Sequence, residues 1–125
     1  MIVVGLGWQK AALADHALEV VTRSLNMVGA MAPDYIAAPE FKNADDLPQL
    51  VARKWGAGVV WVAYEHLRQV QAACHTASST VLGHVGLASV AEACALAGAG
   101  AGARLCLPRQ VFYGVTCAVA EGERK

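Results

Sequence analysis

Two glycines near the amino terminus form the first candidate site for chemistry. Gly5 and Gly7 flank Leu6 directly after a short apolar run, and glycine frees the backbone to turn. The N–H groups of a helix that follows such a turn can bind an anion. A dinucleotide fingerprint needs a third glycine at position 10, where this chain has Lys10. Two interpretations stay open: a tight turn without a ligand, and a loop that accepts a carboxylate or phosphate.

The second candidate is an acidic residue in an alanine-rich stretch. Glu92 is the only acidic residue between Glu65 and Glu121, and it follows Ser89 by three positions. This spacing is the capping box, in which the serine side chain accepts a backbone N–H and the glutamate reaches back. A cap of this kind stabilises a helix by about 1 kcal/mol. Glu92 either serves only this cap, or also faces a pocket as a general acid or base, or as the acceptor for a ligand N–H.

Two cations stand where turns are expected. Lys42 follows the second predicted strand, and Arg109 follows the fourth. A guanidinium can grip a carboxylate in bidentate fashion, which makes Arg109 the stronger candidate of the two. The alternative for each residue is an ordinary solvated cation without a specific partner.

Histidine and cysteine do not form a metal-ligand pattern. The only cluster is Cys74-His75 with His84, and no second pair completes it, so we predict no metal and no cofactor. The cysteines form no C-x-x-C pair and are expected to be free thiols, mostly buried. No Gly-x-Ser-x-Gly motif occurs, and Ser78 and Ser79 have no obvious base in their segment. A serine or cysteine nucleophile therefore has little support.

Hydrophobic periodicity places these residues on alternating strands and helices. Strands are predicted at 2–6, 35–38, 59–62, 103–107 and 115–120. Helices are predicted at 10–28, from 43 or 44 to 55, at 64–72 as one or two turns, and at 89–99, with most of 73–87 as a loop. The pattern indicates a three-layer α/β/α domain with a mixed, mostly parallel sheet and an antiparallel C-terminal strand pair. We expect one domain, residues 1–121, followed by a loose charged tail at 122–125.

Composition limits the class of protein further. Alanine and glycine make up 37 of the 125 residues and aromatic residues 6%, so the core must consist largely of small side chains. Ten basic and ten acidic residues give zero net charge, which argues against a general nucleic-acid binder. The apolar run at 93–103 is about half as long as a membrane span, and no basic region precedes the apolar amino terminus. We therefore expect a cytoplasmic protein with no membrane or nucleic-acid partner.

Three segments carry a resemblance to a known family. They are Val4-Gly5-Leu6-Gly7, the stretch that contains Ser89-Val90-Ala91-Glu92-Ala93, and the closing stretch with Leu107-Pro108-Arg109 and Gly114-Val115-Thr116. Together they resemble the CobE/CbiG C-terminal domain family of cobalamin biosynthesis, over nearly the whole chain. Lys42 matches a basic position that the family tends to keep. Trp8 and Gln9 stand where members often carry Cys and Arg.

The resemblance implies a protein that binds or handles a modified tetrapyrrole, a precorrin intermediate, around ring contraction. Such a macrocycle is apolar and carries acetate and propionate carboxylates, so its binder needs local anion sites and a flat apolar surface. The ligand-binding candidates are Gly5, Gly7, Trp8, Lys42, Ser89, Arg109 and Thr116. The candidates for the flat surface are Trp8, Tyr64, Phe112 and Tyr113.

A second activity is also implied by the resemblance. A fused relative resembles cobalt-precorrin-5A hydrolase, which suggests a hydrolase that opens the ring-contraction lactone with loss of a two-carbon fragment. Glu92 would then be the catalytic acid or base. Binding is slightly favoured, because no nucleophile–base pair is visible in the sequence. Other cobalamin-pathway enzymes are further candidate partners in either case.

Overall fold

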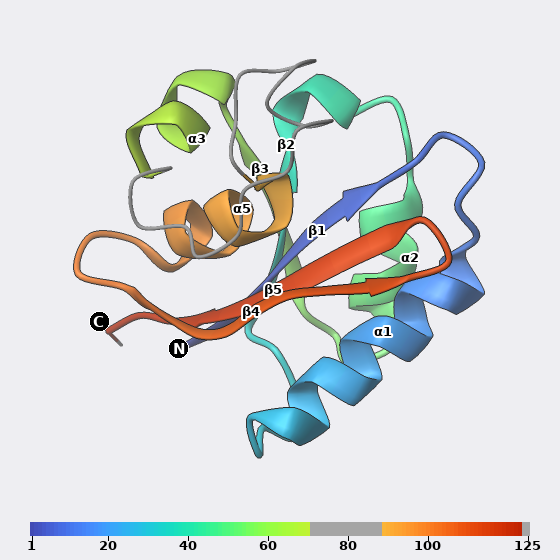
Figure 1. Ribbon diagram of the computed structural model, residues 1–125, viewed down its shortest axis with the longest axis horizontal. Coiled ribbons are helices and arrows are strands. Elements are labelled where there is room, and N and C mark those ends of the chain that lie inside the picture. The colour runs from blue at the N-terminus through green and yellow to red at the C-terminus, as the bar shows by residue number, and fades with distance from the viewer. Residues whose placement is uncertain (71–88, 124–125) are drawn as a thin grey trace.

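A five-stranded sheet forms the middle layer of the protein, and helices cover both of its faces (Figure 1). The computed structural model describes residues 1–70 and 89–123. The elements in chain order are β1 (Ile2–Trp8), α1 (Ala14–Met27), β2 (Tyr35–Pro39), the 3-10 helix η1 (Glu40–Lys42), α2 (Leu47–Arg53), β3 (Gly58–Val62), α3 (Tyr64–Val70), α5 (Val90–Ala99), β4 (Arg104–Phe112) and β5 (Val115–Glu121). The predicted α/β class is confirmed.

The sheet is mixed, with the strand order β3-β2-β1-β5-β4. β1 pairs with β2, and β2 with β3, in parallel, whereas β5 pairs with both β1 and β4 in antiparallel fashion. The antiparallel C-terminal strand pair is therefore confirmed. The expected parallel pairing holds for β1 to β3 only, because β5 runs antiparallel to β1 and β4 runs antiparallel to β5.

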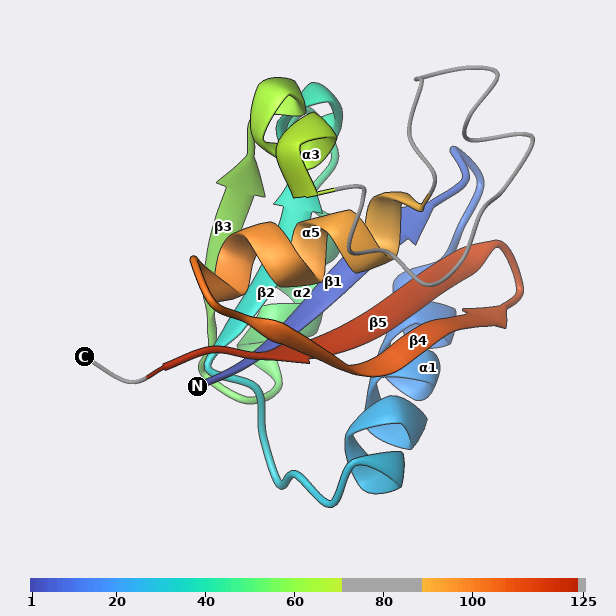
Figure 2. The ribbon, with the colours of Figure 1, turned by 60° about the vertical axis from the view of Figure 1, so that its left-hand side comes forward.

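Two hydrophobic cores lie on opposite faces of the sheet. α1 and α2 pack on one face, and α5 packs with α3 on the other (Figure 2). Side chains alternate along β1, so that Val4, Leu6 and Trp8 join the first core and Val3 joins the second. All four are buried, which makes β1 the central strand of both cores.

The first two glycines lie inside β1, so the predicted turn at Gly5 and Gly7 is wrong. Local sequence suggested a turn, but β1 continues to Trp8 because its whole length, from Ile2, pairs with β5. Gly5 is required by close packing: a Cβ there would lie 2.0 Å from the Ala91 oxygen of α5. Glycine at this position lets an alanine-rich helix rest directly on the strand.

Several predicted boundaries also shift. The helix predicted from residue 10 begins at Ala14, and the one predicted from 43 or 44 begins at Leu47, next to Pro48, which favours a first turn. Gly122, predicted as the first residue of the tail, is buried and exchanges hydrogen bonds with Met1. The predicted loop at 73–87, and with it Cys74, His75, His84, Ser78 and Ser79, lies outside the described residues.

Replacing Gly5 by alanine tests the contact between β1 and α5. The added methyl group would overlap the backbone of Ala91 and the backbone nitrogen of Ala95, and neither can move without shifting the helix. Overpacking of this kind costs about 1–3 kcal/mol or more, so we expect G5A to lower the melting temperature by at least about 5 °C.

Gly58→Ala is the matched control for this prediction. A Cβ at Gly58 meets only the ring of Tyr35, an exposed side chain that can rotate away. Thermal unfolding followed by circular dichroism should place G58A close to the unmodified protein. A melting temperature of G5A equal to that of G58A would contradict the close packing of α5 on β1.

Candidate functional site

The carboxyl ends of β1 and β2 lie at one edge of the sheet, where several of the predicted residues meet. Trp8 is the last residue of β1, and β2 ends at Pro39, directly before the 3-10 helix that carries Lys42. The strand order reverses at β1, because β2 and β3 lie on one side of it and β5 and β4 lie on the other. Open α/β sheets bind ligands in the crevice at such a switch point.

Lys42 rests on Trp8. Its Nζ donates a hydrogen bond to the Trp8 carbonyl oxygen and lies 5.2 Å from the centre of the indole ring, in a cation–π contact. Lys42 is half-buried, and this burial lowers its pKa, while the nearby Asp45 carboxylate raises it. Among the described residues, no carboxylate forms an ion pair with Lys42. The ammonium has three N–H groups, so two remain for another acceptor.

Asp45 is a residue of this site that sequence analysis did not single out. Its Oδ2 accepts a hydrogen bond from the Trp8 Nε1 at 2.7 Å, and its Oδ1 accepts one from the backbone N–H of Leu47 at 3.1 Å. Its own N–H donates to the Lys42 carbonyl oxygen at 3.0 Å. An aspartate two residues ahead of Leu47-Pro48 is a recognisable helix-start signal, but nothing in the sequence points from it to Trp8.

The amino end of α5 carries the predicted capping residues. Ser89 Oγ accepts a hydrogen bond from the backbone N–H of Glu92 at 3.3 Å, as the capping box requires. Glu92 is completely buried, and its Oε2 accepts the backbone N–H of Arg109 at 2.8 Å. The carboxylate therefore joins α5 to β4, in addition to its place in the first turn of the helix.

Arg109 lies within β4, so its predicted position in a turn is wrong. The pairing of β4 with β5 shifts between Leu107 and Gln110, where β4 carries one residue more than its partner strand. Such a bulge leaves a backbone group without its ladder partner. Glu92 provides the acceptor that the Arg109 N–H needs, which explains a buried carboxylate at this point of the helix.

Thr116 and Gly7 face each other across the β1–β5 pair. Thr116 Oγ1 donates to the Gly7 carbonyl oxygen at 3.2 Å, and a Cβ at Gly7 would lie 2.7 Å from the same hydroxyl. Val90, the first residue of α5, lies above Gly7. Gly5 lies two residues before Gly7 in β1, beneath Ala91, and its backbone is covered by the helix.

The predicted site residues thus form two groups at the carboxyl end of β1. Trp8 and Lys42 belong to the side of the sheet that α1 and α2 cover. Gly7, Thr116, Ser89, Glu92 and Arg109 belong to the side that α5 covers. Trp8 follows Gly7 directly, so β1 connects the two groups. Trp8 is only 6% exposed, and it therefore supports Lys42 and offers little flat surface to a ligand.

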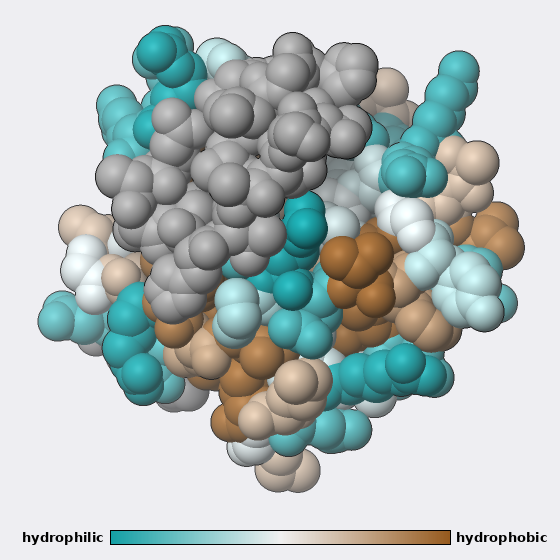
Figure 3. Space-filling view, viewed as in Figure 1, coloured by the Kyte–Doolittle hydropathy of each residue, from teal (hydrophilic) through white to brown (hydrophobic). Residues whose placement is uncertain are grey.

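The other aromatic candidates belong to the β4–β5 hairpin and to α3. Tyr113 is 70% exposed in the β4–β5 turn and stacks on His16, with ring centres 4.6 Å apart, while Phe112 meets both rings edge-on. These ring contacts explain why His16 is half-covered. Tyr64 is exposed at the start of α3. On the face seen in Figure 3, apolar surface lies beside polar surface near the β4–β5 hairpin.

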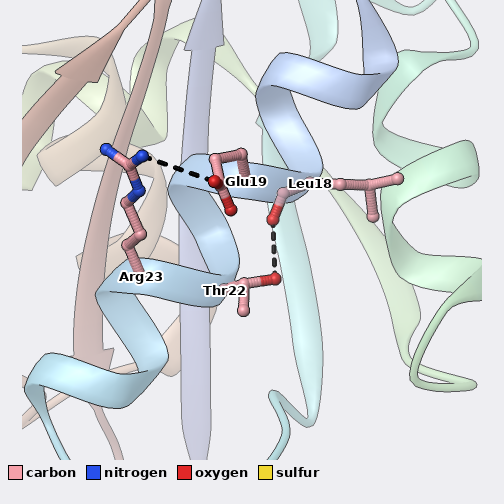
Figure 4. A network of polar contacts seen from close by, with 4 residues as sticks. All are labelled: Leu18, Glu19, Thr22 and Arg23. Carbon is pink, nitrogen blue, oxygen red and sulfur yellow. Dashed lines mark hydrogen bonds and ion pairs between the residues drawn. The ribbon is translucent and has the colours of Figure 1, made fainter.

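An open groove of about 450 Å³ runs along α1, lined by Asp15, His16, Leu18, Glu19, Thr22, Lys54 and Phe112. The polar groups around it are largely satisfied within the helix. Thr22 Oγ1 donates to the Leu18 carbonyl oxygen at 2.7 Å, and Arg23 pairs with Glu19 at 3.3 Å (Figure 4). An exposed pair at this spacing contributes a few tenths of a kcal/mol. The groove includes neither Lys42 nor Glu92 and is a solvated helix face.

Two further observations concern metals and membranes. Residues 1–70 and 89–123 contain no group of three or more His, Cys, Asp or Glu side chains arranged to hold a metal ion. None of the helices in that part of the chain has the length and hydropathy of a membrane span.

Burial raises the pKa of the Cys117 thiol to about 12, and its sulfur contacts Ser24 Oγ at 3.4 Å.

Fold and site together define a class: a three-layer α/β domain with a half-buried cation at the switch point of a mixed sheet. The chain belongs to the family described as cobalamin synthesis G C-terminus, whose model matches residues 2–120. The predicted resemblance is therefore confirmed. No curated protein sequence matches the chain.

Solved structures of similar proteins agree with this family. The cobalamin biosynthesis protein ChiG from Agrobacterium tumefaciens str. C58 is 36% identical, with 99% of this chain and 100% of that chain covered and a TM-score of 0.78. CobE, a protein from the cobalamin (vitamin B12) biosynthetic pathway, is 24% identical, with 100% and 92% covered and a TM-score of 0.90. A cobalamin biosynthesis protein G homolog from Sulfolobus solfataricus is 16% identical, with 99% and 37% covered and a TM-score of 0.68.

The bond between Glu92 and Arg109 leads to a local prediction. Glu92→Gln keeps a side-chain oxygen that can accept the Arg109 N–H, whereas Glu92→Ala leaves that N–H without its acceptor. An unsatisfied group of this kind costs about 1–3 kcal/mol. We expect E92A to lose that amount of unfolding free energy in urea and to exchange its Arg109 amide hydrogen at least tenfold faster. E92Q should stay closer to the unmodified protein in both measurements, and equal Arg109 exchange in all three proteins would contradict the contact.

Proposed function

We propose that this protein binds a modified tetrapyrrole intermediate of cobalamin biosynthesis at the carboxyl end of β1, with Lys42 holding one of its carboxylates. Membership of the cobalamin synthesis G family supplies the pathway. The observation that carries the site is Lys42 itself, a half-buried ammonium with no ion-pair partner among the described residues. Pathway enzymes that supply or receive the intermediate are its further proposed partners.

Burial of Lys42 without a counter-ion favours an anionic ligand. Partial removal from water destabilises an ammonium, and the lowered pKa of Lys42 expresses that effect. A ligand carboxylate at the two remaining N–H groups would restore the lost hydrogen bonding and form a charge-assisted contact. An anion therefore stabilises the Lys42 ammonium more than it would stabilise the ammonium of a fully solvated lysine.

Other groups at the same edge can contribute to binding. The half-buried Arg109 can grip a second carboxylate in bidentate fashion. The hydroxyl of Thr116 donates its hydrogen to the Gly7 carbonyl oxygen and can still accept a ligand N–H. Ser89 caps the first turn of α5 and Gly7 lies beneath Val90, so both fix the start of the helix beside Thr116. The exposed Tyr113 and Val111 on the β4–β5 hairpin offer apolar surface for a macrocycle.

The hydrolase alternative rests on one observation, the buried carboxylate of Glu92 in the first turn of α5. Opening a lactone would need Glu92 to activate a water, and E92Q would then abolish turnover of the lactone intermediate while binding is kept. The bond to the Arg109 N–H already gives this carboxylate a structural role. We therefore place binding first.

Replacement of Lys42 by methionine tests the proposed function. Methionine keeps most of the chain length and apolar contact but has no ammonium. A charge-assisted hydrogen bond contributes about 1.5–3 kcal/mol, so the dissociation constant of a corrin polycarboxylate should rise about 10- to 100-fold. Cobyrinic acid, a coloured corrin with free carboxylates, can be titrated by its visible absorption. Lys54→Met is the control, because Lys54 lies over Trp55 and bonds to Thr22, away from the site; equal affinity of K42M and K54M would contradict the proposal.

The same binding should depend on pH through Lys42. The ammonium is the binding form, and its pKa lies below the usual 10.5. Affinity for cobyrinic acid should therefore fall as the pH rises through that lowered pKa, before a free lysine would titrate. Lys42→Arg, which stays charged to higher pH, should keep its affinity over the same range. Parallel pH profiles of the two proteins would exclude Lys42 as the titrating group.

A further inference from the structure

Trp8 contacts two side chains of opposite charge by different parts of its structure. The indole Nε1 donates to the Asp45 carboxylate at 2.7 Å. The carbonyl oxygen accepts from the Lys42 ammonium, which also lies over the indole ring, 5.2 Å from its centre. A single residue at the end of β1 therefore contacts a carboxylate and an ammonium at the same time.

Without Trp8, these two groups would be expected to pair. Asp45 and Lys42 are three residues apart, both are half-buried, and the backbone N–H of Asp45 donates to the Lys42 carbonyl oxygen. The carboxylate is near enough to raise the pKa of Lys42, yet the two do not form an ion pair within 4.0 Å. Opposite charges this near attract each other, and they do so more strongly where burial lowers the local dielectric.

The carboxylate stays away from Lys42 because both of its oxygens have other donors. Oδ2 accepts the indole N–H of Trp8, and Oδ1 accepts the backbone N–H of Leu47 at the start of α2. The ammonium, in turn, is held by the Trp8 carbonyl and ring. Trp8 therefore contacts both charged groups, and the two groups do not pair with each other.

We propose that Trp8 is a positioning residue that keeps Asp45 and Lys42 apart, so that the Lys42 ammonium stays open to a carboxylate ligand. The ligand part of this inference rests on the proposed function, whereas the separation of the two charges does not. Loss of the indole N–H frees one carboxylate oxygen, which then closes on the ammonium. An internal ion pair occupies the donors that a ligand carboxylate would need, so the site is blocked by a neighbouring residue.

The test combines Trp8→Phe with Asp45→Asn. Phenylalanine keeps a ring under Lys42 and removes the N–H, and the side-chain carbon signals of Lys42 report its pKa by NMR. We expect W8F to raise that pKa by about one unit and to raise the dissociation constant for cobyrinic acid at least tenfold. In W8F/D45N, where no carboxylate can close on Lys42, the pKa increase should disappear and the affinity should return at least to that of the unmodified protein.

Two controls separate this mechanism from simpler ones. Asp46 is exposed, follows Asp45 directly and makes no side-chain cap bond, so W8F/D46N removes an equal charge and should not restore binding. A pKa increase caused only by water entering beside a smaller ring would persist in W8F/D45N, and that result would overturn the proposal. Weak binding by W8F that D45N does not restore would overturn it as well.

A second variant covers the case in which W8F folds poorly. Incorporation of 3-benzothienylalanine at position 8 keeps the size and shape of the indole and replaces its N–H by sulfur. The same pKa increase and loss of affinity are expected, with the same restoration by D45N. If no form binds cobyrinic acid but the pKa of Lys42 changes as described, the separation by Trp8 is supported and the proposed function fails; an unchanged pKa in both position-8 variants contradicts the separation itself.

Discussion

The backbone contact between β1 and α5 is the constraint on which the rest of the structure depends. Gly5 leaves no room for a Cβ, because the backbone of α5 passes directly above it at Ala91 and Ala95. A helix can approach a strand this closely only where both present small side chains. The alanines of α5 therefore have a geometric purpose, since they bring the first turn of the helix to the carboxyl end of β1.

This close approach determines how the polar groups on that side are satisfied. Glu92 is completely buried, so its carboxylate needs a protein donor, and the bulge in β4 provides the Arg109 N–H. The Arg109 N–H at the bulge therefore gains an acceptor, and the buried Glu92 carboxylate gains a donor. On the opposite side of β1, Trp8 has a similar function for Asp45 and Lys42. Both ends of the site are held by hydrogen bonds between elements that are distant in sequence.

Much of the fold could be predicted from the sequence because its signals are local. The β-branched runs around Val3 and Val59, the helical spacing of 14–27 and the Ser89–Glu92 capping pattern each depend on residues within one element. The α/β class and the final strand pair follow from their order. Lys42 and Arg109 became candidates because each follows a predicted strand, and the family resemblance then matched Lys42 to a basic position. The structure places Lys42 on the end of β1 and bonds the Arg109 backbone to the first turn of α5.

The parts that could not be predicted depend on partners far away in the chain. Gly-Leu-Gly is typical of a turn, and only pairing with β5, more than a hundred residues later, makes it a strand. Pro108 next to Arg109 suggests the end of a strand, whereas an edge strand with a bulge tolerates proline. Asp45 has the pattern of a helix start, and its bond to Trp8 requires the loop after β2 to meet the end of β1. Each error has the same origin, a tertiary contact that overrides a local signal.

A zero net charge is compatible with a ligand rich in carboxylates for a reason that this arrangement makes clear. Net charge governs long-range attraction, which salt screens within about 10 Å, whereas affinity at a site depends on which donors are open and how far they are removed from water. In the proposed site, Lys42 is half-buried and has two donors open, while the neighbouring Asp45 is bonded to the Trp8 indole. Selectivity for a polyanion can therefore be built from hydrogen-bond geometry in a chain whose charges balance.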